Sequence, residues 1–181
     1  YFQKNDVVHG AQLLEAEISR DPGNDHLVMT VEQVYMGRGM YSNALAVVER
    51  RLSLSPDDPQ WLVTRGSIEI ALKKYDDAIA TLNRVLAARK DDGAAIFQRA
   101  RAYFLSGQLD AARADYEMLQ QSHTNSFVYY YALGEIAWRQ HDTNEAIRNY
   151  EGYLLYAPPN TTEAGTVSNR LQQLKQISGG K

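Results

Sequence analysis

Residues capable of chemistry are few in this sequence and lie far apart. The chain has four histidines and no cysteine, which excludes thiolate catalysis, disulfides and cysteine-based metal sites. None of the four, at His9, His26, His123 and His141, has another histidine at the i,i+4 spacing of a helical metal site. The nucleophile motif G-x-S-x-G and a phosphate-binding loop are also missing. We therefore predict that the chain is not an enzyme and has no catalytic, cofactor or metal site.

Acidic residues recur in pairs whose places indicate helix starts. The pairs are Asp57-Asp58, Asp76-Asp77 and Asp91-Asp92, and no segment has calcium-loop spacing. Aspartate at a helix start caps backbone amides and complements the helix dipole. We interpret these pairs as capping residues rather than metal ligands.

Composition limits the class of partner. The 181 residues carry a formal net charge of −3, whereas nucleic-acid binding needs clustered Lys and Arg. No apolar run approaches the ~20 residues that span a bilayer. We expect neither nucleic-acid binding nor direct membrane insertion, and a protein or peptide as the partner.

The elements that position these residues show a strict period. Ala44, Ala78, Ala112 and Ala146 recur at one constant spacing of about 34 residues, which is typical of stacked helical hairpins. A large residue lies four positions after each alanine. The residue twelve positions before each alanine is small in three of the four repeats, and these residues are Glu32, Gly66, Ala100 and Gly134. We expect Gly66 to face Ala78, and Glu32 either to loosen the first hairpin or to reach solvent. The predicted helices are 25–38 and 41–54, 59–72 and 75–88, 93–106 and 109–121, and 127–140 and 143–156.

The fourth unit carries a family resemblance. It reads Tyr130-x2-Leu133-Gly134, then Ala146-x3-Tyr150, then Pro158, which resembles the tetratricopeptide repeat signature. The resemblance implies an all-α fold, an α-solenoid of antiparallel helical hairpins wound as a right-handed superhelix. Polar residues replace the usual apolar ones at Arg65, Glu69 and Arg99. The implied repeats are 25–58, 59–92, 93–126 and 127–158.

The flanks of the four repeats have separate interpretations. Residues 1–4 are a tag remnant or disordered start, because Tyr1-Phe2-Gln3 resembles the end of a cleavable expression tag. Residues 5–22 continue the register upstream as the second helix of a truncated repeat. We expect them to leave an apolar edge open to self-association, formed by Val7, Leu14 and Ile18.

The segment 160–177 is predicted to be a solubilising C-terminal capping helix, followed by a flexible tail at 178–181. Asn160 and Glu163 have capping-box spacing at its start. Its apolar stripe is Ala164, Val167, Leu171, Leu174 and Ile177. Leu171 and Leu174 should be buried near Tyr150 and Leu154.

The resemblance also implies a binding face, because the first helix of each hairpin lines the concave side in this family. Aromatic residues beside Arg are common interface anchors, and Met adapts to varied partners. Phe97, Arg101, Tyr131 and Trp138 are expected to form one aromatic and cationic patch, although packing between hairpins is the alternative role for many face residues. The candidate partner-binding residues are Met29, Gln33, Met36, Thr64, Ser67, Phe97, Gln98, Arg101, Tyr131, Glu135, Trp138 and Arg139.

These features predict a non-catalytic scaffold that binds a peptide, a helix or a protein in the concave groove, as part of a larger bacterial assembly protein. The alternative is a dedicated chaperone of a secreted or exported hydrophobic substrate. A clamp for acidic chaperone tails is not expected, because the places of the Lys and Asn residues that form it in the family are occupied here by Met29, Gln33, Thr64, Ala94 and Gln98. The compartment stays open, with the cell envelope slightly favoured over the cytoplasm.

Overall fold

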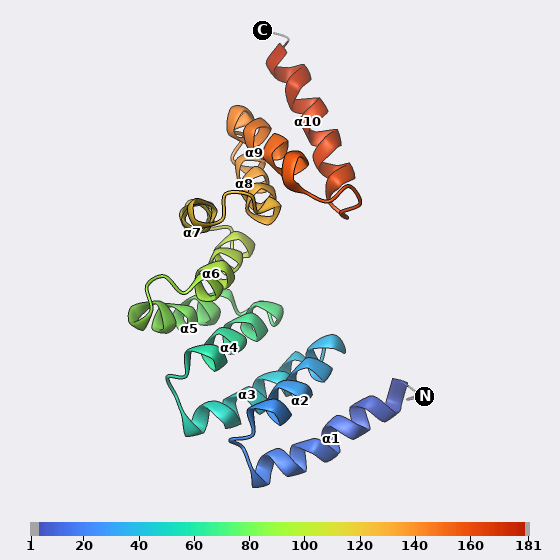
Figure 1. The fold of residues 1–181 in the computed structure, drawn as a ribbon, viewed down its shortest axis with the longest axis vertical. Coiled ribbons are helices and arrows are strands. Elements are labelled where there is room, and N and C mark those ends of the chain that lie inside the picture. The colour runs from blue at the N-terminus through green and yellow to red at the C-terminus, as the bar shows by residue number, and fades with distance from the viewer. Residues whose placement is uncertain (1–3, 180–181) are drawn as a thin grey trace. The chain divides into compact units, whose positions relative to one another are not determined.

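The structure is all-helical in its described part. The computed structural model describes residues 4–179, with side chains for residues 9–178, and contains ten α-helices and no strand in this range (Figure 1). The eight helices predicted within the four repeats are confirmed, each to within one residue at its ends. The helices are α1 (Lys4–Arg20), α2 (Asp25–Gly37), α3 (Tyr41–Leu54), α4 (Pro59–Ala71), α5 (Tyr75–Ala88), α6 (Gly93–Leu105), α7 (Leu109–Ser122), α8 (Phe127–Arg139), α9 (Thr143–Tyr156) and α10 (Ala164–Gly179).

Side chains cap the N-termini of α4 and α6, the first helices of their hairpins, where the sequence predicts them. The Asp58 carboxylate accepts from the Gln60 and Trp61 amides, with Pro59 in the first turn. Asp92 accepts from the Ala95 amide at 3.0 Å in the same way. These contacts satisfy amides that have no partner inside the helix, which confirms the capping role of these two aspartates.

The turn inside each hairpin repeats one backbone conformation. Among the described residues, positive φ angles occur at Gly39, Lys73, Gly107 and His141, at 71°, 61°, 84° and 60°. These positions recur with the same period as the alanines. Glycine adopts such angles without strain, whereas Lys73 and His141 adopt them at an energetic cost.

The chain divides into two compact units. Unit 1 ends at Ala102 and unit 2 begins at Tyr103, so the boundary falls inside α6. Unit 1 contains α1, the α2–α3 and α4–α5 hairpins, and most of α6. Unit 2 contains the end of α6, α7, the α8–α9 hairpin and α10. Each unit has a core of residues with little or no exposed surface.

Small residues allow the two helices of a hairpin to approach closely. A Cβ on Gly66 would lie 2.9 Å from Leu82, and one on Gly134 would lie 2.6 Å from the Tyr150 ring. The nearest side chain to each glycine is thus the large residue four positions after the repeat alanine. Ala78, which the sequence predicts to face Gly66, is fully buried in a cluster with Ile70 and Ala102.

Glu32 occupies the place of these glycines in the first hairpin. Its side chain remains partly exposed, and burial raises the pKa of its carboxyl above the ordinary value. Partial exposure fits the expectation that this residue must reach solvent.

A polar network joins the first two hairpins of unit 1. The Asp25 carboxylate accepts from Arg51 Nε at 2.5 Å and from the indole N–H of Trp61 at 3.0 Å. The Arg51 hydrogen bond holds the pKa of the Asp25 carboxyl below its usual value. Arg51 also reaches the Asp58 carboxylate at 3.4 Å. The network therefore connects the start of α2, the end of α3 and the start of α4.

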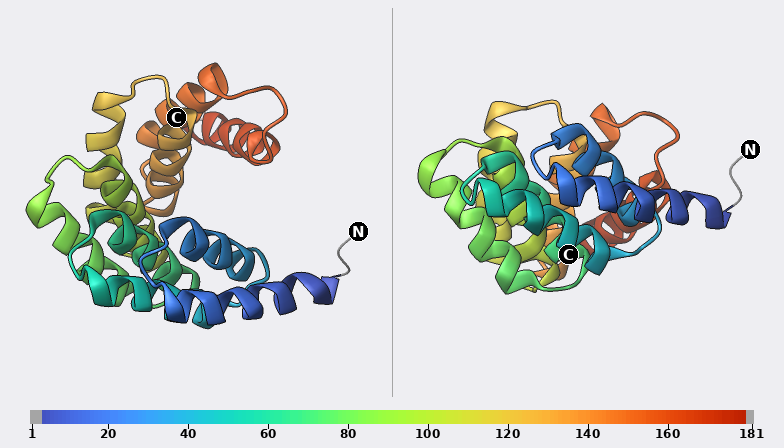
Figure 2. Two further views of the ribbon diagram at one scale, coloured as in Figure 1. Left: turned by 60° about the horizontal axis from the view of Figure 1, so that its bottom comes forward. Right: turned by 90° about the horizontal axis from the view of Figure 1, so that it is seen from below.

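The α1 helix packs against the first hairpin of unit 1. Both views of Figure 2 show it running alongside α2. Ala11 and Ile18 are buried, whereas Leu13 and Leu14 are exposed. The predicted apolar edge was therefore wrong for Ile18, because this residue lies on the inner side of α1. Leu14 does lie on the open side, and the Val7 side chain is outside the described residues.

In unit 2, α10 covers the last hairpin. Val167, Leu171 and Leu174 join one buried cluster with Tyr150 and Tyr153, which confirms the predicted burial of the two leucines. Ile177 stays exposed, so the apolar stripe ends one turn early. The helix begins at Ala164, four residues after the expected cap at Asn160, and runs through Ser178 to Gly179. Residues 1–3 and 180–181, which hold most of the predicted start and half of the predicted tail, lie outside the described residues.

Candidate functional site

The predicted binding face of unit 1 begins on α2. Met29 is 38% exposed, Gln33 is exposed and Met36 is half-buried. The opposite side of the helix, which includes Val31 and Tyr35, is fully buried. The 3.6-residue period of the helix therefore separates a core side from a side that carries two thioethers and an amide.

The α4 helix contributes two half-buried hydroxyls. Thr64 donates to the Gln60 carbonyl at 3.0 Å, and Ser67 donates to the Thr64 carbonyl at 2.8 Å. Both hydroxyl protons are used within the helix, so these side chains offer a partner acceptor oxygens and a small contact surface.

The α6 helix supplies the cationic member of the unit 1 face. Phe97, Gln98 and Arg101 are half-buried, and Arg101 Nη1 donates to the Gln98 side-chain oxygen at 2.8 Å. The guanidinium thus meets a neutral amide in this contact rather than a carboxylate.

The α8 candidates of unit 2 make several contacts within their own unit. Tyr131 lies against Tyr153, with ring centroids 5.7 Å apart, and its burial raises the pKa of its hydroxyl. The Arg139 guanidinium lies 4.0 Å from the Phe104 ring centroid and donates to the Phe104 carbonyl at 3.5 Å. Arg139 nevertheless remains exposed.

Glu135 and Trp138 meet the capping helix through one residue. The Glu135 carboxylate accepts from the Tyr150 hydroxyl at 2.9 Å and from Arg170 Nη1. The Arg170 guanidinium also lies 5.2 Å from the Trp138 ring centroid. Burial raises the pKa of the Tyr150 hydroxyl, and the adjacent Glu135 carboxylate adds to this effect. Glu135 thus pairs with an internal cation, and only part of Trp138 faces outward.

Sequence reasoning missed Arg170. It lies beside Leu171 in the apolar stripe of α10, where a charge needs a partner. Glu135 lies on a first helix where mostly apolar residues are expected, so it could have indicated that a cation such as Arg170 lies nearby. The proposed patch of Phe97, Arg101, Tyr131 and Trp138 includes residues of both units and stays a prediction.

Two further findings bear on the kind of site. Within the described residues, no group of three His, Cys, Asp or Glu side chains is arranged to hold a metal ion. None of the described helices has the length and apolar character needed to cross a bilayer.

Comparison with known families identifies the repeat. Two family models, both described as tetratricopeptide repeat, match residues 33–92 and 69–136, which together run over more than half of the chain. The chain belongs to the tetratricopeptide repeat family. Tetratricopeptide arrays generally act as non-catalytic protein-interaction modules, because stacked repeats create extended binding surfaces.

Solved structures support the same fold. PilW, described as a widely conserved type IV pilus biogenesis factor, is 14% identical with a TM-score of 0.80, covering 94% of this chain and 79% of its own. MamA of Desulfovibrio magneticus RS-1 is 18% identical with a TM-score of 0.73, covering 83% of this chain and 85% of its own.

A third similar structure is YrrB, described as a tetratricopeptide protein with an unusual peptide-binding site. It is 15% identical with a TM-score of 0.71, covering 93% of this chain and 84% of its own. A sequence comparison with curated proteins finds no match. At these identities the likenesses establish the tetratricopeptide fold alone.

Proposed function

We propose that this chain is a non-catalytic scaffold that holds a peptide, a helix or a protein against the first helices of its hairpins. The observation that carries this proposal is the two-sided character of α2. Its Val31 and Tyr35 side is fully buried, while Met29, Gln33 and Met36 retain exposed surface. Partly exposed thioethers on a rigid helix suit an apolar partner surface.

The spacing of these residues suggests how a partner binds. Met29 and Met36 lie two helical turns apart on nearly the same face, with Gln33 between them. A partner helix with apolar residues at a similar spacing would bury both thioethers, and Gln33 could hydrogen-bond its polar groups. Thr64 and Ser67 on α4 are small enough for such a segment to approach closely.

Arg101 would select and orient the partner. Its guanidinium contacts the neutral Gln98 in the free protein, so an acidic side chain on the partner would supply a charge-assisted hydrogen bond. We propose that the preferred segment is apolar on one side and carries at least one carboxylate.

In unit 2, the proposed anchors are the outward parts of Tyr131, Trp138 and Arg139. Trp138 also contacts Arg170, so its truncation affects stability as well as binding. A Trp138→Ala, Arg101→Ala double variant tests the proposed patch only when helicity and melting temperature are compared with those of the parent. Glu135 would act by positioning Arg170 and Tyr150.

We propose assembly at the bacterial cell envelope as the setting. Support comes from the fold shared with PilW, which is described as a pilus biogenesis factor. The alternative is a chaperone for an exported hydrophobic substrate. A chaperone would release its client after export, whereas a scaffold would remain bound in the finished assembly.

Photo-crosslinking tests the proposed face. A photoreactive residue at Gln33, on the proposed face of α2, should form an adduct with the partner in the source cells. The same group at Ser42, an exposed position on α3, is the matched control. The adduct identifies the partner by mass spectrometry. Persistence of the adduct in the assembled structure favours the scaffold, and its presence only before export favours the chaperone.

Binding measurements with the purified partner then give the contribution of this face to affinity. Met29→Ala with Met36→Ala should weaken binding about tenfold or more, because each buried anchor contributes on the order of 1 kcal/mol or more. Met118→Ala on α7 is the control, since this side chain is also exposed. Adducts of equal yield at Gln33 and Ser42, or unchanged affinity in the double variant, would exclude this face.

A further inference from the structure

The α10 helix repeats the register of a first helix. Val167 and Leu171 follow Leu133 and Ala137 of α8 by one repeat period, and all four are buried. In the same register, Ser168 follows Gly134. The capping helix therefore buries the same repeat positions that the first helix of a further hairpin would bury.

Ser168 differs from the small residues of the complete hairpins in its exposure. Gly66, Ala100 and Gly134 are buried, and the side chains of Leu82 and Tyr150 lie over the two glycines. Ser168 is exposed, and its hydroxyl bonds only to the Ala164 carbonyl among the described contacts. The site at which a second helix would contact α10 is thus open.

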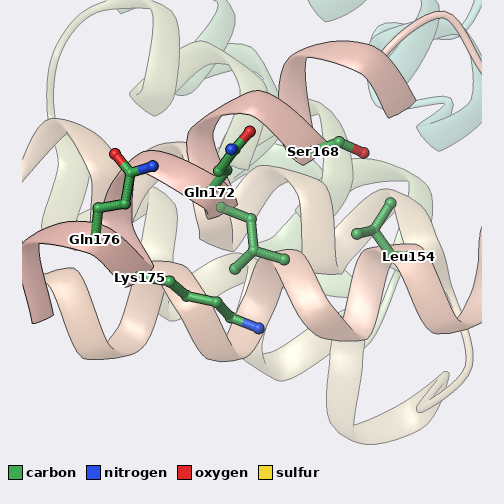
Figure 3. Close-up of a pocket in the computed structure, with 6 residues that line it drawn as sticks. Leu154, Ser168, Gln172, Lys175 and Gln176 are labelled. Atoms are coloured by element: carbon green, nitrogen blue, oxygen red, sulfur yellow. The ribbon is translucent and has the colours of Figure 1, made fainter. Parts of the chain in front are cut away.

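A surface hollow marks this site. It has a volume of about 480 Å³ and lies between α9 and α10 (Figure 3). Leu154 and Leu171 supply its apolar surface, and the other lining residues are polar. The residues that line it are Leu154, Ser168, Leu171, Gln172, Lys175 and Gln176.

The α1 helix has the complementary character, because it repeats the register of a second helix. Leu13 and Leu14 precede Val47 and Val48 by one repeat period. In all four hairpins the residues at these two places are buried: Val47, Val48, Thr81, Leu82, Asp115, Tyr116, Asn149 and Tyr150.

In α1 the same two places are open. Leu13 is 63% exposed and Leu14 is 37% exposed. Leu14 occupies the position from which Leu82 contacts Gly66 and Tyr150 contacts Gly134. The chain thus presents an unfilled small-residue position on α10 and an unburied large residue on α1.

We propose that α1 of one copy docks in the α9–α10 hollow of a second copy, with Leu14 against Ser168. The two helices then form a hairpin whose halves come from different molecules. In this hairpin Leu14 would contact Ser168 as Leu82 contacts Gly66 inside one chain. This contact uses residues of α1, α9 and α10, whereas the proposed partner-binding residues are on α2, α4, α6 and α8, and it does not depend on that function.

The contact joins two different surfaces and is therefore heterologous, so each copy offers one donor face and one acceptor face. This property gives a decisive test by sedimentation velocity on the full chain. The parent should associate as its concentration rises. Leu14→Glu should remove the donor face and Ser168→Arg the acceptor face, each raising the dissociation constant about tenfold or more.

An equimolar mixture of the two variants should form a complex of two chains and no larger species, because each variant retains the face that the other lacks. Met118→Glu introduces a charge at an exposed site on α7 and should associate like the parent. Circular dichroism and melting confirm that each variant is folded, and Leu14→Met should keep the association.

Three outcomes would overturn the proposal. The parent could remain a monomer at every concentration. Ser168→Arg could associate as the parent does while Leu14→Glu does not, which would mean that α1 binds another surface. The mixture of folded variants could remain monomeric.

Discussion

The Tyr150 ring lies directly over Gly134, so closely that a Cβ at residue 134 would come within 2.6 Å of it. Tyr150 is fully buried and its hydroxyl donates to Glu135, so the ring has little room to move. Gly134→Ala should therefore lower the free energy of unfolding by about 1–3 kcal/mol, despite the better helix propensity of alanine.

Chemical denaturation measures this loss, and Gly10→Ala is the control. A Cβ on Gly10 meets no atom within 4 Å, so this helical substitution should be neutral or stabilising. Equal effects of the two substitutions would mean that the space beside Tyr150 is larger than the structure shows.

The Arg170–Glu135 pair should stabilise unit 2 more than an exposed pair does. Arg170→Met would leave Glu135 with the Tyr150 hydroxyl as its remaining described partner, and should lower the free energy of unfolding by about 2–3 kcal/mol. Lys175→Met removes the exposed pair with Glu151 and should cost less than about 1 kcal/mol. Similar losses in urea denaturation would show that Arg170 is not needed to compensate Glu135.

Glu32 should make the protein less stable as pH rises. Burial raises its folded-state pKa above the ordinary 4.5, so its contribution is favourable below that value. That contribution is lost as pH rises through the folded-state pKa, where the partly buried carboxyl ionises. Glu32→Gln should therefore be more stable than the parent at pH 7 and lose this advantage near pH 4.

Denaturant unfolding at the two pH values measures the difference, and its sign is the result that matters. Glu17→Gln changes an exposed carboxylate and serves as the control. An advantage for Glu32→Gln that persists unchanged at low pH could not arise from ionisation.

The apolar residues of α10 should contribute unequally to the free energy of unfolding. Leu171 belongs to the buried cluster around Tyr150, so Leu171→Ala should lower the free energy of unfolding by about 2–4 kcal/mol. Ile177 is 62% exposed, and Ile177→Ala should change it by less than about 0.5 kcal/mol. Thermal melting of the two variants compares them, and a small loss for Leu171→Ala would mean that α10 is only loosely attached.

The hairpin turns should respond to glycine in opposite ways. Lys73 has a φ of 61°, so Lys73→Gly should raise the free energy of unfolding by about 0.5–1 kcal/mol. Gly107 has a φ of 84°, and Gly107→Ala should lower it by about 1 kcal/mol. Melting temperatures that move in the same direction for both variants would contradict this account.

Much of the fold could be predicted because the repeat period fixes several contacts at once. Ala44, Ala78, Ala112 and Ala146 are all fully buried, so the spacing of four small residues was enough to place eight helices. Local capping signals worked where a carboxylate preceded the helix directly, as at Asp58 and Asp92. They failed at Asn160, where an irregular turn precedes α10.

The interactions of the candidate face were harder to predict, because they join residues far apart in sequence. Glu135 meets Arg170 on another helix, a pairing that no local spacing indicates. Ile18 was placed on the open side of α1 because it shares a helical face with Leu14, yet only Ile18 reaches the first hairpin. The contribution of each candidate residue to partner binding remains a prediction.

The left-handed residue that closes each hairpin turn also makes the array modular. The stretch from Pro59 to Asp92 begins behind one capping aspartate and ends with another, and it contains its own turn at Lys73. A duplicate of this stretch placed after Asp92 would meet the same cap that Asp58 provides for Pro59. The number of hairpins can therefore change by whole repeats, each with its own capping aspartate and turn, so that copy number sets the length of a tetratricopeptide array.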